Sequence, residues 1–300
     1  MQLREGQVAV VTGAAGGIGR ALADRFARSG LRVVLADVDE AALAAAAAEV
    51  AALGVETLGV PTDVSDAAAV DGLAAATLER FGAVHVVCNN AGVASTGDPW
   101  FGPISGWRWV LGVNLWGVIH GVRAFLPALA GQEESHIINT ASIAGLVPGF
   151  GPSYDASKHA VVAISEDLYR QLQMIGLPIG VSVLCPGWVR TGIVDADRNW
   201  PDELGEPPPA APGFDVMAEH VRRAVDEGAQ PSYVADLVAA AVESGSFWVF
   251  PHPEFVELAI RRWHGIAEGL NPEPIDDVPG LPPADELRRQ VMERLAPPVT

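Results

Sequence analysis

Hydrophobic and polar positions follow two alternating patterns through most of the chain. Short runs of valine, isoleucine and leucine, typical of buried strands, are separated by longer stretches in which apolar residues recur with helical spacing. The strand-like runs span residues 7–12, 32–36, 56–60, 84–88, 136–141, 181–185 and 246–250. Strands that alternate with helices predict a parallel sheet covered on both faces. We therefore expect an α/β fold with a doubly wound, mostly parallel, seven-stranded sheet.

The stretches between and after the strands indicate the domain organisation. Helices are predicted up to about residue 29 and over 40–53, 66–81, 104–129, 153–175, 234–244, 254–269 and 284–296. The segment 192–231 is poorly patterned, with one helical piece near 216–226, and an insert of this size is typical of a lid or binding loop. We expect one domain over residues 1–252 with a substrate lid at about 192–231, followed by a C-terminal helical extension and tail over 253–300.

Composition and charge disfavour several partners. The chain is 49% apolar, enough for one large core, and its formal charge of -18 disfavours nucleic acid and anionic membranes, which bind clustered basic surface. No charged leader or long apolar run occurs, so we expect no secretory signal, no membrane-spanning helix and a cytoplasmic location. Cys88 and Cys185 lie in strand-like runs and are expected to be buried hydrophobes. The histidines show no metal-binding spacing, so no metal is expected.

A glycine-rich turn follows the first predicted strand. Gly13, Gly17 and Gly19 lie between a strand that ends at Thr12 and the start of a helix. Glycines let the backbone approach a pyrophosphate closely, and the N-terminus of a helix adds N–H groups and a partial positive charge. Strand, turn and helix in this order predict a dinucleotide-binding turn.

An acidic residue ends the second predicted strand. Asp37 lies eighteen residues beyond Gly19, where a carboxylate can accept hydrogen bonds from the adenine-ribose hydroxyls and would repel a 2′-phosphate. Ala14, Ala15 and Val38 are not basic, so nothing nearby would neutralise that phosphate. We expect NAD rather than NADP. The alternative is that Asp37 only caps the next helix.

Polar residues also follow other predicted strands. Asp63, Asn90 and Ser142 come within three residues of the end of such runs, and Pro186 follows the sixth. Because ligands of a parallel sheet bind at the carboxyl ends of its strands, we expect these residues at one edge. Asn114 differs, since it is an amide inside an apolar predicted helix and needs partners there. It either makes a structural hydrogen bond or distorts the helix and holds a water near the site.

Lys158 is the only lysine in the chain. It lies four residues after Tyr154, so on a helix the two side chains share one face. At about 4 Å and an effective dielectric of about 20, the ammonium favours the phenolate by roughly 4 kcal/mol, or about three pK units, before desolvation is subtracted. The phenol would then titrate near neutral pH, where a general acid or base works best. The plainer alternative is a tyrosine and a lysine on a solvated helix face.

Together these residues resemble the short-chain dehydrogenase/reductase family, whose sheet is Rossmann-like, over about residues 5–250. The resemblance rests on Thr12, Gly13, Gly17, Gly19, Asp63, Val64, Asn89, Asn90, Ala91, Gly92, Asn114, Ser142, Tyr154, Lys158, Pro186, Gly187 and Thr191. Each motif is modest alone, but the set is specific because all occur together, in order and at strand ends. The insert after Thr191 and the long segment beyond the seventh strand depart from the family pattern, which leaves substrate and assembly open.

The resemblance implies an NAD-dependent alcohol dehydrogenase or ketoreductase that interconverts a secondary alcohol and a ketone by hydride transfer. Tyr154 would be the general acid/base, and Lys158 would lower its pKa and hold the nicotinamide ribose. Ser142 would position the substrate oxygen, and Asn114 would support a proton relay through water. The implied cofactor-binding residues are Gly13, Gly17, Ile18, Gly19, Asp37, Asp63, Val64, Asn90, Ala91, Gly92, Tyr154, Lys158, Pro186, Gly187, Val189 and Thr191.

Aromatic and aliphatic residues crowd the three loops expected on the substrate side, residues 93–101, 143–150 and 188–200. The expected pocket residues are Ile143, Leu146, Phe150, Trp188 and Ile193, with Trp100, Phe101, Val147 and Trp200 in the same loops. Such walls favour a bulky apolar or aromatic alcohol or ketone over a sugar or a charged acid. The alternative is that several of these aromatics pack the lid onto the core.

Two other functions stay open on the sequence. A reductase of carrier- or CoA-linked 3-oxoacyl chains would use the same catalytic residues, but usually takes NADPH and has a basic docking face, neither of which is evident. A non-catalytic NAD-sensing or scaffold protein would keep the fold without turnover, which the intact catalytic set disfavours. The resemblance also implies a small-molecule substrate and a homodimer or homotetramer built through helices 104–129 and 153–175.

Overall fold

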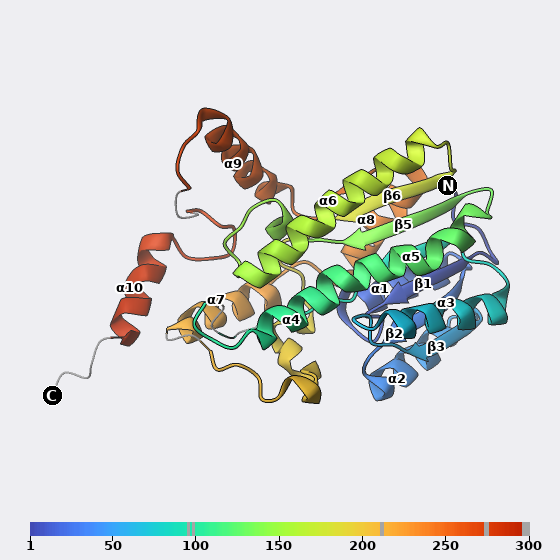
Figure 1. Cartoon of the computed structure of the whole chain (residues 1–300), viewed down its shortest axis with the longest axis horizontal. Coiled ribbons are helices and arrows are strands. Elements are labelled where there is room, and N and C mark those ends of the chain that lie inside the picture. Colours follow the sequence, from blue (N-terminus) through green and yellow to red (C-terminus); the bar gives the residue numbers. More distant parts are fainter. Residues whose placement is uncertain (95–96, 98–99, 211–212, 273–275, 296–300) are drawn as a thin grey trace.

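The computed structural model describes residues 1–94, 97, 100–210, 213–272 and 276–295. Its centre is a seven-stranded sheet in the order β3-β2-β1-β4-β5-β6-β7, in which every strand pair is parallel (Figure 1). The strands are β1 (Val8–Thr12), β2 (Arg32–Asp37), β3 (Thr57–Pro61), β4 (Val86–Asn89), β5 (Ser135–Thr140), β6 (Ile179–Leu184) and β7 (Trp248–Val249). The predicted α/β, doubly wound sheet is confirmed.

Alternating side chains of each central strand pack on opposite faces of the sheet. In β1, Ala9 and Val11 join one apolar cluster, whereas Val8 and Val10 join another. All four side chains are fully buried. Both faces of a parallel sheet must be covered, and this is why the strands read as nearly continuous apolar runs in the sequence.

Helices cover the two faces in two layers. The first face carries α1 (Gly17–Arg28), α2 (Glu40–Ala51) and α8 (Pro231–Ser244), and the second carries α3 (Ala67–Phe81), α5 (Gly117–Ala130) and α6 (Pro152–Met174). Asp39 and Asp66 begin α2 and α3, because each carboxylate accepts a backbone N–H of the first helical turn. The core therefore consists of two apolar layers, one on each side of the sheet.

A long helical run, Ser105–Ala130, crosses the second face. It consists of α4 (Ser105–Leu111), a π-helical turn (Gly112–Trp116) and α5. Among the described residues, this is the one helix that length and apolar composition alone would allow to cross a membrane. The core helix of a folded domain passes the same test, and α5 packs here on β4 and β5. Gly121 lets α5 approach the sheet, since an added Cβ would overlap the Asn89 amide.

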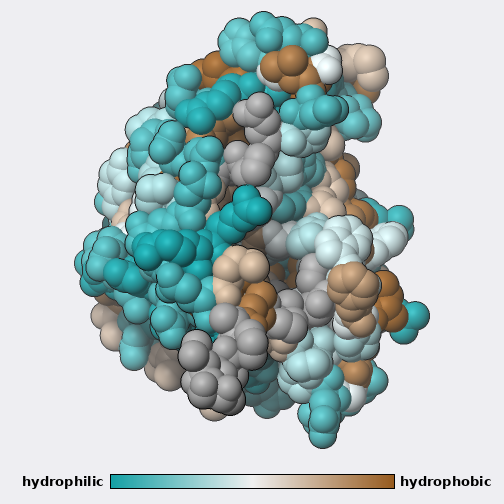
Figure 2. All heavy atoms as spheres, turned by 90° about the vertical axis from the view of Figure 1, so that its left-hand side faces the viewer, coloured by the Kyte–Doolittle hydropathy of each residue, from teal (hydrophilic) through white to brown (hydrophobic). Residues whose placement is uncertain are grey.

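Apart from α8 and β7, which belong to the sheet and its first helix layer, the segment beyond β6 forms a group of helices at one end of the molecule (Figure 1). After two 3-10 helices, Gly192–Asn199 and Asp202–Leu204, come α7 (Phe214–Asp226) and, beyond β7, a 3-10 turn (Pro253–Phe255), α9 (Val256–Glu268) and α10 (Ala284–Leu295). Viewed from that end, the surface is hollowed between ridges of mostly hydrophilic residues (Figure 2). The lid expected at 192–231 and the C-terminal extension thus lie together.

We expect Gly121→Ala to destabilise the fold by about 1–3 kcal/mol, because the new methyl group must displace the buried Asn89 amide. Gly72→Ala, in the exposed middle of α3, is the matched control, since nothing lies within 4 Å of its added Cβ. Alanine is the better helix former there and should add roughly 0.5–1 kcal/mol of stability. Urea unfolding of the two variants measures both values, and equal stability of the two would contradict this account of α5 packing.

Candidate active site

A cavity of about 1160 Å³ opens at the carboxyl edge of the sheet. It exceeds the usual range for a small-molecule pocket, about 300–1,000 Å³, so it offers room for a dinucleotide and a second ligand. Most of the residues expected from the sequence line it: Gly13, Gly17, Ile18, Asp37, Asp63, Val64, Asn90, Ala91, Gly92, Ser142, Ile143, Phe150, Tyr154, Lys158, Pro186, Gly187, Trp188, Val189, Thr191 and Ile193. Gly19, Asn114 and Leu146 do not line the cavity.

The glycine turn between β1 and α1 is shaped by close contacts. Gly13 and Gly17 have φ angles of 64° and 54°, in the left-handed region that favours glycine. An added Cβ on Gly13 would lie 2.8 Å from Ala91 Cα, and one on Gly19 would overlap the Gly13 carbonyl. Gly19 therefore acts behind the turn, by letting α1 pack closely. The turn and the N-terminus of α1 form a cradle that suits a phosphate group.

The Asp37 carboxylate lies at the adenine end expected for a dinucleotide. It accepts the Ala15 N–H at 2.9 Å and the Asp39 N–H at 3.1 Å, and it lines the cavity. Asp39, and not Asp37, caps α2, so the capping alternative for Asp37 is not what the structure shows. Among the described lining residues, the cationic side chains are Lys158, Arg198 and Arg222, which come from α6, the 3-10 helix Gly192–Asn199 and α7.

Three strand ends are tied together by side chains. The Thr12 hydroxyl accepts the N–H groups of Asn90 and Ala91, at 2.9 and 3.1 Å, and the Asn90 amide donates to the Thr12 carbonyl at 2.9 Å. The Thr140 hydroxyl then donates to Asn90 Oδ1 at 3.2 Å. These hydrogen bonds fix the ends of β1, β4 and β5 relative to one another, so the centre of the cavity has a rigid floor.

Asn114 lies in the π-helical turn and is fully buried. Its amide exchanges two hydrogen bonds with the backbone of Val93, at 2.8 and 3.0 Å, and donates a third to Ser157 Oγ at 3.1 Å. The sequence left open whether this amide makes a structural hydrogen bond or distorts its helix and holds a water near the site. The structure shows the structural hydrogen bonds and a π-helical turn at this residue. An added Cβ on Gly92 would lie 3.5 Å from both Asn114 Oδ1 and Lys158 Nζ. Asn114 and Lys158 therefore both lie beside Gly92, although Asn114 does not line the cavity.

Tyr154, Ser142 and Lys158 meet at the centre of the cavity. The Ser142 hydroxyl lies within reach of the Tyr154 phenol and favours its ionised form. It also donates to the Pro186 carbonyl at 3.3 Å and accepts the Ala144 N–H at 3.1 Å. Lys158 Nζ lies 5.6 Å from the centroid of the Tyr154 ring and donates to the Thr140 carbonyl at 2.9 Å. The pair therefore faces one cavity, and the alternative of a solvated helix face is wrong.

The pKa of the Tyr154 phenol is raised, whereas the sequence led us to expect that Lys158 lowers it, so this expectation is wrong for the protein alone. Burial raises the pKa of the phenol to about 12, and the hydrogen bond from Ser142 opposes this only in part. Burial also lowers the pKa of Lys158 to about 8. The charge of Lys158 alone would lower the pKa of Tyr154, but desolvation of the two groups is the larger effect here.

Asp155, next to the tyrosine, holds the loop that precedes α6. Its carboxylate accepts the Gly149 N–H at 2.7 Å, the Phe150 N–H at 3.2 Å and the Gly151 N–H. Burial raises the pKa of this carboxyl group, and these N–H groups oppose that shift. Gly149 and Gly151 have φ angles of 136° and 133°, so the loop needs glycine at both positions. The loop carries Phe150 into the wall of the active-site cavity.

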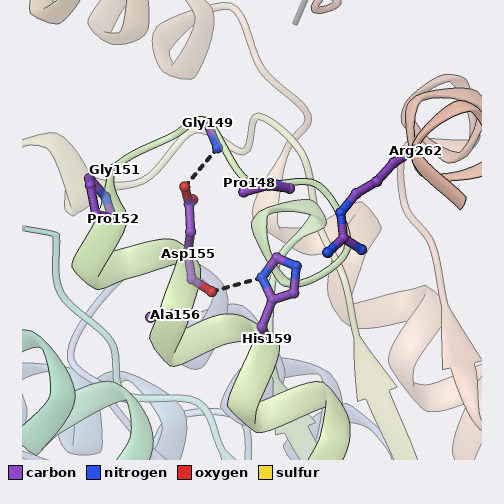
Figure 3. A pocket seen from close by; sticks show the side chains of 8 residues that line it. All are labelled: Pro148, Gly149, Gly151, Pro152, Asp155, Ala156, His159 and Arg262. Atoms are coloured by element: carbon purple, nitrogen blue, oxygen red, sulfur yellow. Dashed lines mark hydrogen bonds between the residues drawn. The ribbon is translucent and has the colours of Figure 1, made fainter. Parts of the chain in front are cut away.

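A second cavity, of about 520 Å³, lies beside the same loop. His159 Nδ1–H donates to the Asp155 carbonyl at 2.9 Å, and Arg262 of α9 extends toward the ring from the other side (Figure 3). Arg262 itself donates to the Leu146 carbonyl at 3.2 Å. Gly149 lines both cavities, so the loop is the partition between them.

The substrate side agrees with the expected loops in part. Leu146 packs among the buried side chains of two apolar clusters instead of facing the cavity. Trp100 and Phe101 do not line the cavity either, and 70% and 95% of their surfaces are exposed. Of the expected loop 93–101, residues 95–96 and 98–99 lie outside the described residues. Trp200 does line the cavity, and its ring also packs against that of Trp109. This residue therefore fits both the pocket expectation and the packing alternative.

Several lining residues carry no local sequence signal. The lid helix α7 contributes Phe214, Met217 and Val221, and Phe255 lies under the loop after β6. An added Cβ on Gly187 would lie 2.7 Å from the Phe255 ring. The missed lining residues also include Thr62, Ser65, Trp109, Val113, Ala196, Arg198, Arg222, Val278, Leu281 and Leu287. Only the helical periodicity of α7 could have indicated that one of its faces is apolar.

His252 holds the same loop after β6. It accepts the Gly187 N–H at Nδ1, at 3.1 Å, and burial lowers the pKa of its ring. A neutral ring is required for this acceptance, since both nitrogens of a charged ring carry protons. The Pro186-Gly187 turn is therefore fixed from behind by His252, which follows β7.

Comparison with known proteins identifies relatives over most of the chain. The sequence model of a family described as short chain dehydrogenase matches residues 7–202. The chain is 40% identical to a 1-deoxy-11-beta-hydroxypentalenate dehydrogenase of Streptomyces exfoliatus, over 83% of this chain and 84% of the relative. It is 31% identical to a C alpha-dehydrogenase of a Sphingobium species, over 89% of this chain and 87% of the relative.

A solved structure agrees closely with this fold. It is a short chain dehydrogenase/reductase from Burkholderia phymatum in complex with NAD. It is 43% identical to this chain, covers 93% of this chain and 100% of its own, and superposes with a TM-score of 0.89.

Lys158 should lower the stability of the protein at neutral pH, and we expect Lys158→Met to unfold at a higher temperature than the wild type at pH 7. Because burial lowers the folded pKa to about 8, the unfolded chain binds this proton more tightly than the folded protein does. The cost is therefore full below about pH 8 and shrinks as the pH rises toward 10.5. At pH 7 the gain should be roughly 1–3 kcal/mol after the loss of the hydrogen bond to Thr140.

Thermal unfolding of both proteins at pH 7 and pH 9.5 measures this effect. The difference in stability between Lys158→Met and the wild type should be larger at pH 7 than at pH 9.5. The variant lacks the titrating ammonium and therefore serves as the reference at each pH. A variant that is less stable than the wild type at both pH values would contradict a costly buried ammonium.

Proposed function

The chain belongs to the short-chain dehydrogenase family of oxidoreductases, and from this membership we propose that it interconverts a bulky, apolar secondary alcohol and its ketone with NAD. The observation that carries the proposal is the meeting of Ser142, Tyr154 and Lys158 in the cavity that also contains the glycine turn. Such a reaction needs a proton donor, a buried cation and a phosphate-binding turn along one cavity.

The residues around the cavity fit an NAD molecule. The turn at Gly13 and Gly17 would hold the diphosphate, and Asp37 would accept hydrogen bonds from the adenine ribose. Asp63 and Val64 would line the adenine site, and Lys158 would hold the nicotinamide ribose. When bound, the dinucleotide supplies the acceptor or donor of a hydride. The related structure from Burkholderia phymatum contains NAD, which supports this choice.

The chain's own groups manage the proton. In alcohol oxidation, Tyr154 would take the hydroxyl proton while Ser142 keeps the substrate oxygen within reach, and in reduction Tyr154 would return it. The phenol needs help to ionise, since burial alone raises its pKa to about 12. The Lys158 ammonium, held by Thr140 at 2.9 Å, supplies positive charge beside the ring. With one of its three N–H groups on Thr140, two remain for other oxygen atoms.

Asn114 would act behind the lysine. Its amide fixes the backbone of Val93 and lies on the same side of Gly92 as Lys158 Nζ. This placement supports a proton path from Tyr154 through Lys158 toward a water near Asn114. The π-helical turn there is a device often found at functional sites.

The substrate compartment favours an apolar molecule. Its walls include Ile143, Phe150, Trp188, Ile193 and Trp200, and the ring of Trp188 stands edge-on to that of Phe150. Burying apolar surface against such walls stabilises a ligand by about 25 cal/mol per Å². The names of two relatives, a hydroxypentalenate dehydrogenase and a C alpha-dehydrogenase, support an alcohol or ketone of this kind.

Assembly through the long helices stays part of the proposal. Three exposed apolar side chains lie along these helices. Ile104 directly precedes α4, Trp116 ends the π-helical turn and Met174 ends α6, and they are 60%, 52% and 80% exposed. A homodimer or homotetramer that covers these helices would bury them. Light scattering of the purified protein tests this part, and a monomer at micromolar concentration would contradict it.

A screen of secondary alcohols with NAD tests the main proposal through the absorbance of the reduced dinucleotide. Aryl and bulky alicyclic alcohols should turn over faster than polyols. Faster turnover of polyols would contradict the apolar compartment, and no turnover of any alcohol or ketone would contradict the reaction itself.

Tyr154→Phe should lower turnover by about 10²–10⁴-fold, because it removes the proton donor and acceptor. Binding of NAD, measured by quenching of tryptophan fluorescence, should change little. Tyr169→Phe is the control, since Tyr169 lies on the same helix and packs against Phe247 at 5.3 Å between ring centroids. Turnover near the wild-type rate in Tyr154→Phe would assign the proton transfer to another group.

Asp37→Ala should narrow the preference for NAD over NADP by about tenfold, because it removes the charge that repels a 2′-phosphate. The ratio of kcat/KM values for the two dinucleotides measures the preference. Asp66→Ala is the control, since Asp66 caps a helix with the same chemistry but does not line the cavity. If the ratio stays unchanged, Asp37 has no part in cofactor choice.

A further inference from the structure

The C-terminal segment returns to the active-site cavity. Val278, Leu281 and Leu287 line it, although they lie some ninety or more residues beyond the loop after β6. All three side chains are only half-buried in the protein without ligands. They present apolar surface that a ligand in the cavity could cover.

Trp188 connects this segment to the centre of the site. Its indole N–H donates to the Pro279 carbonyl at 2.6 Å. An added Cβ on Gly280 would lie 3.1 Å from the indole ring, so the chain passes directly over it. Val278 packs on the apolar cluster that contains Phe150 and Trp188. The segment is thus held both by a hydrogen bond and by packing, next to the Pro186-Gly187 turn.

The helix that follows, α10, braces the lid helix α7. An added Cβ on Gly213 would lie 2.9 Å from Val291, and the His220 ring hydrogen-bonds Gln290 at 2.7 Å. Arg294 pairs with Asp215 at 2.7 Å. This exposed ion pair alone contributes little to stability. The packing and polar contacts along α10 together hold it against α7.

The braced helix carries another part of the same wall. Met217, Val221 and Val225 of α7 line the cavity. The end of α7 is tied back to the sheet edge, because the Ala229 N–H donates to the Trp188 carbonyl at 3.0 Å. Trp188 therefore contacts both the lid helix segment, through its backbone, and the C-terminal segment, through its side chain.

We propose that residues 278–287, latched by the Trp188 side chain, form the outer wall of the substrate compartment and select for large apolar substrates. This inference rests on the proposed function, since it assigns walls to that same site. A ligand that extends beyond the reacting carbon would bury Val278, Leu281 and Leu287. A small alcohol would not reach them and would gain nothing from the wall.

Trp188→Phe is the first test, because it keeps an aromatic ring and removes the N–H that holds Pro279. The measured quantity is the ratio of kcat/KM for a large alicyclic alcohol to that for 2-propanol, and it should fall at least tenfold. Trp263→Phe is the matched control: Trp263 is 58% exposed on α9, and its ratio should stay at the wild-type value. A wild-type ratio in Trp188→Phe would overturn the latch.

A second variant tests the wall without touching the latch. Leu281→Asp places a charge in the apolar wall and should lower the same ratio at least tenfold, whereas Glu293→Asp on the exposed outside of α10 should not. Limited trypsin digestion gives a readout besides activity, since Arg288 and Arg289 lie in α10. Cleavage there should be at least five times faster in Trp188→Phe than in the wild type, and equal rates would contradict the latch.

Binding of a ligand separates failure of this inference from failure of the proposed function. Prodan, a neutral naphthyl ketone, becomes more fluorescent in apolar surroundings and requires no turnover. If no alcohol is oxidised but Leu281→Asp weakens prodan binding at least tenfold, the reaction is wrong and the wall is right. If alcohols are oxidised and both variants keep the wild-type selectivity and prodan affinity, the wall is wrong and the reaction stands.

Discussion

The burial of an ammonium and a phenol in one cavity is the constraint on which the rest of this structure depends. Burial moves the pKa of Lys158 down to about 8 and that of Tyr154 up to about 12, so ionisation of either group is disfavoured by the protein alone. Their partners, the Thr140 carbonyl and the Ser142 hydroxyl, both come from the end of β5. One strand end thus holds both groups of the proposed acid/base pair.

The surroundings of this pair are rigid because several strand ends are joined to one another. Thr12, Asn90 and Thr140 link β1, β4 and β5 through side-chain hydrogen bonds, and Asn114 fixes the loop after β4 from the long helix behind it. Groups held in this way need not reorganise when charge develops, which is the usual advantage of a preorganised site. The distorted helix at Asn114 is the local cost of placing an amide there.

The two halves of the cavity are built differently. The half toward the glycine turn is made from short loops at the sheet edge, whereas the other half combines the loop before α6, the lid helix and the C-terminal segment. Asp155 fixes the loop before α6, and Trp188 connects the loop after β6 to the C-terminal segment. On our proposal, the first half carries the chemistry common to the family and the second half carries the choice of substrate.

The sequence by itself determined the sheet, its helices and the residues at the carboxyl edge. Strand and helix periods, the glycines of the first turn and the polar residues after each strand are local signals, and a parallel sheet brings strand ends together whatever else the chain does. Only the tertiary structure decided the pKa directions of Tyr154 and Lys158, because desolvation depends on neighbours from distant segments. It also decided that Leu146 packs inward and that Leu281 reaches the cavity. Contacts between segments so far apart leave no periodic pattern in the sequence, so no local signal could predict them.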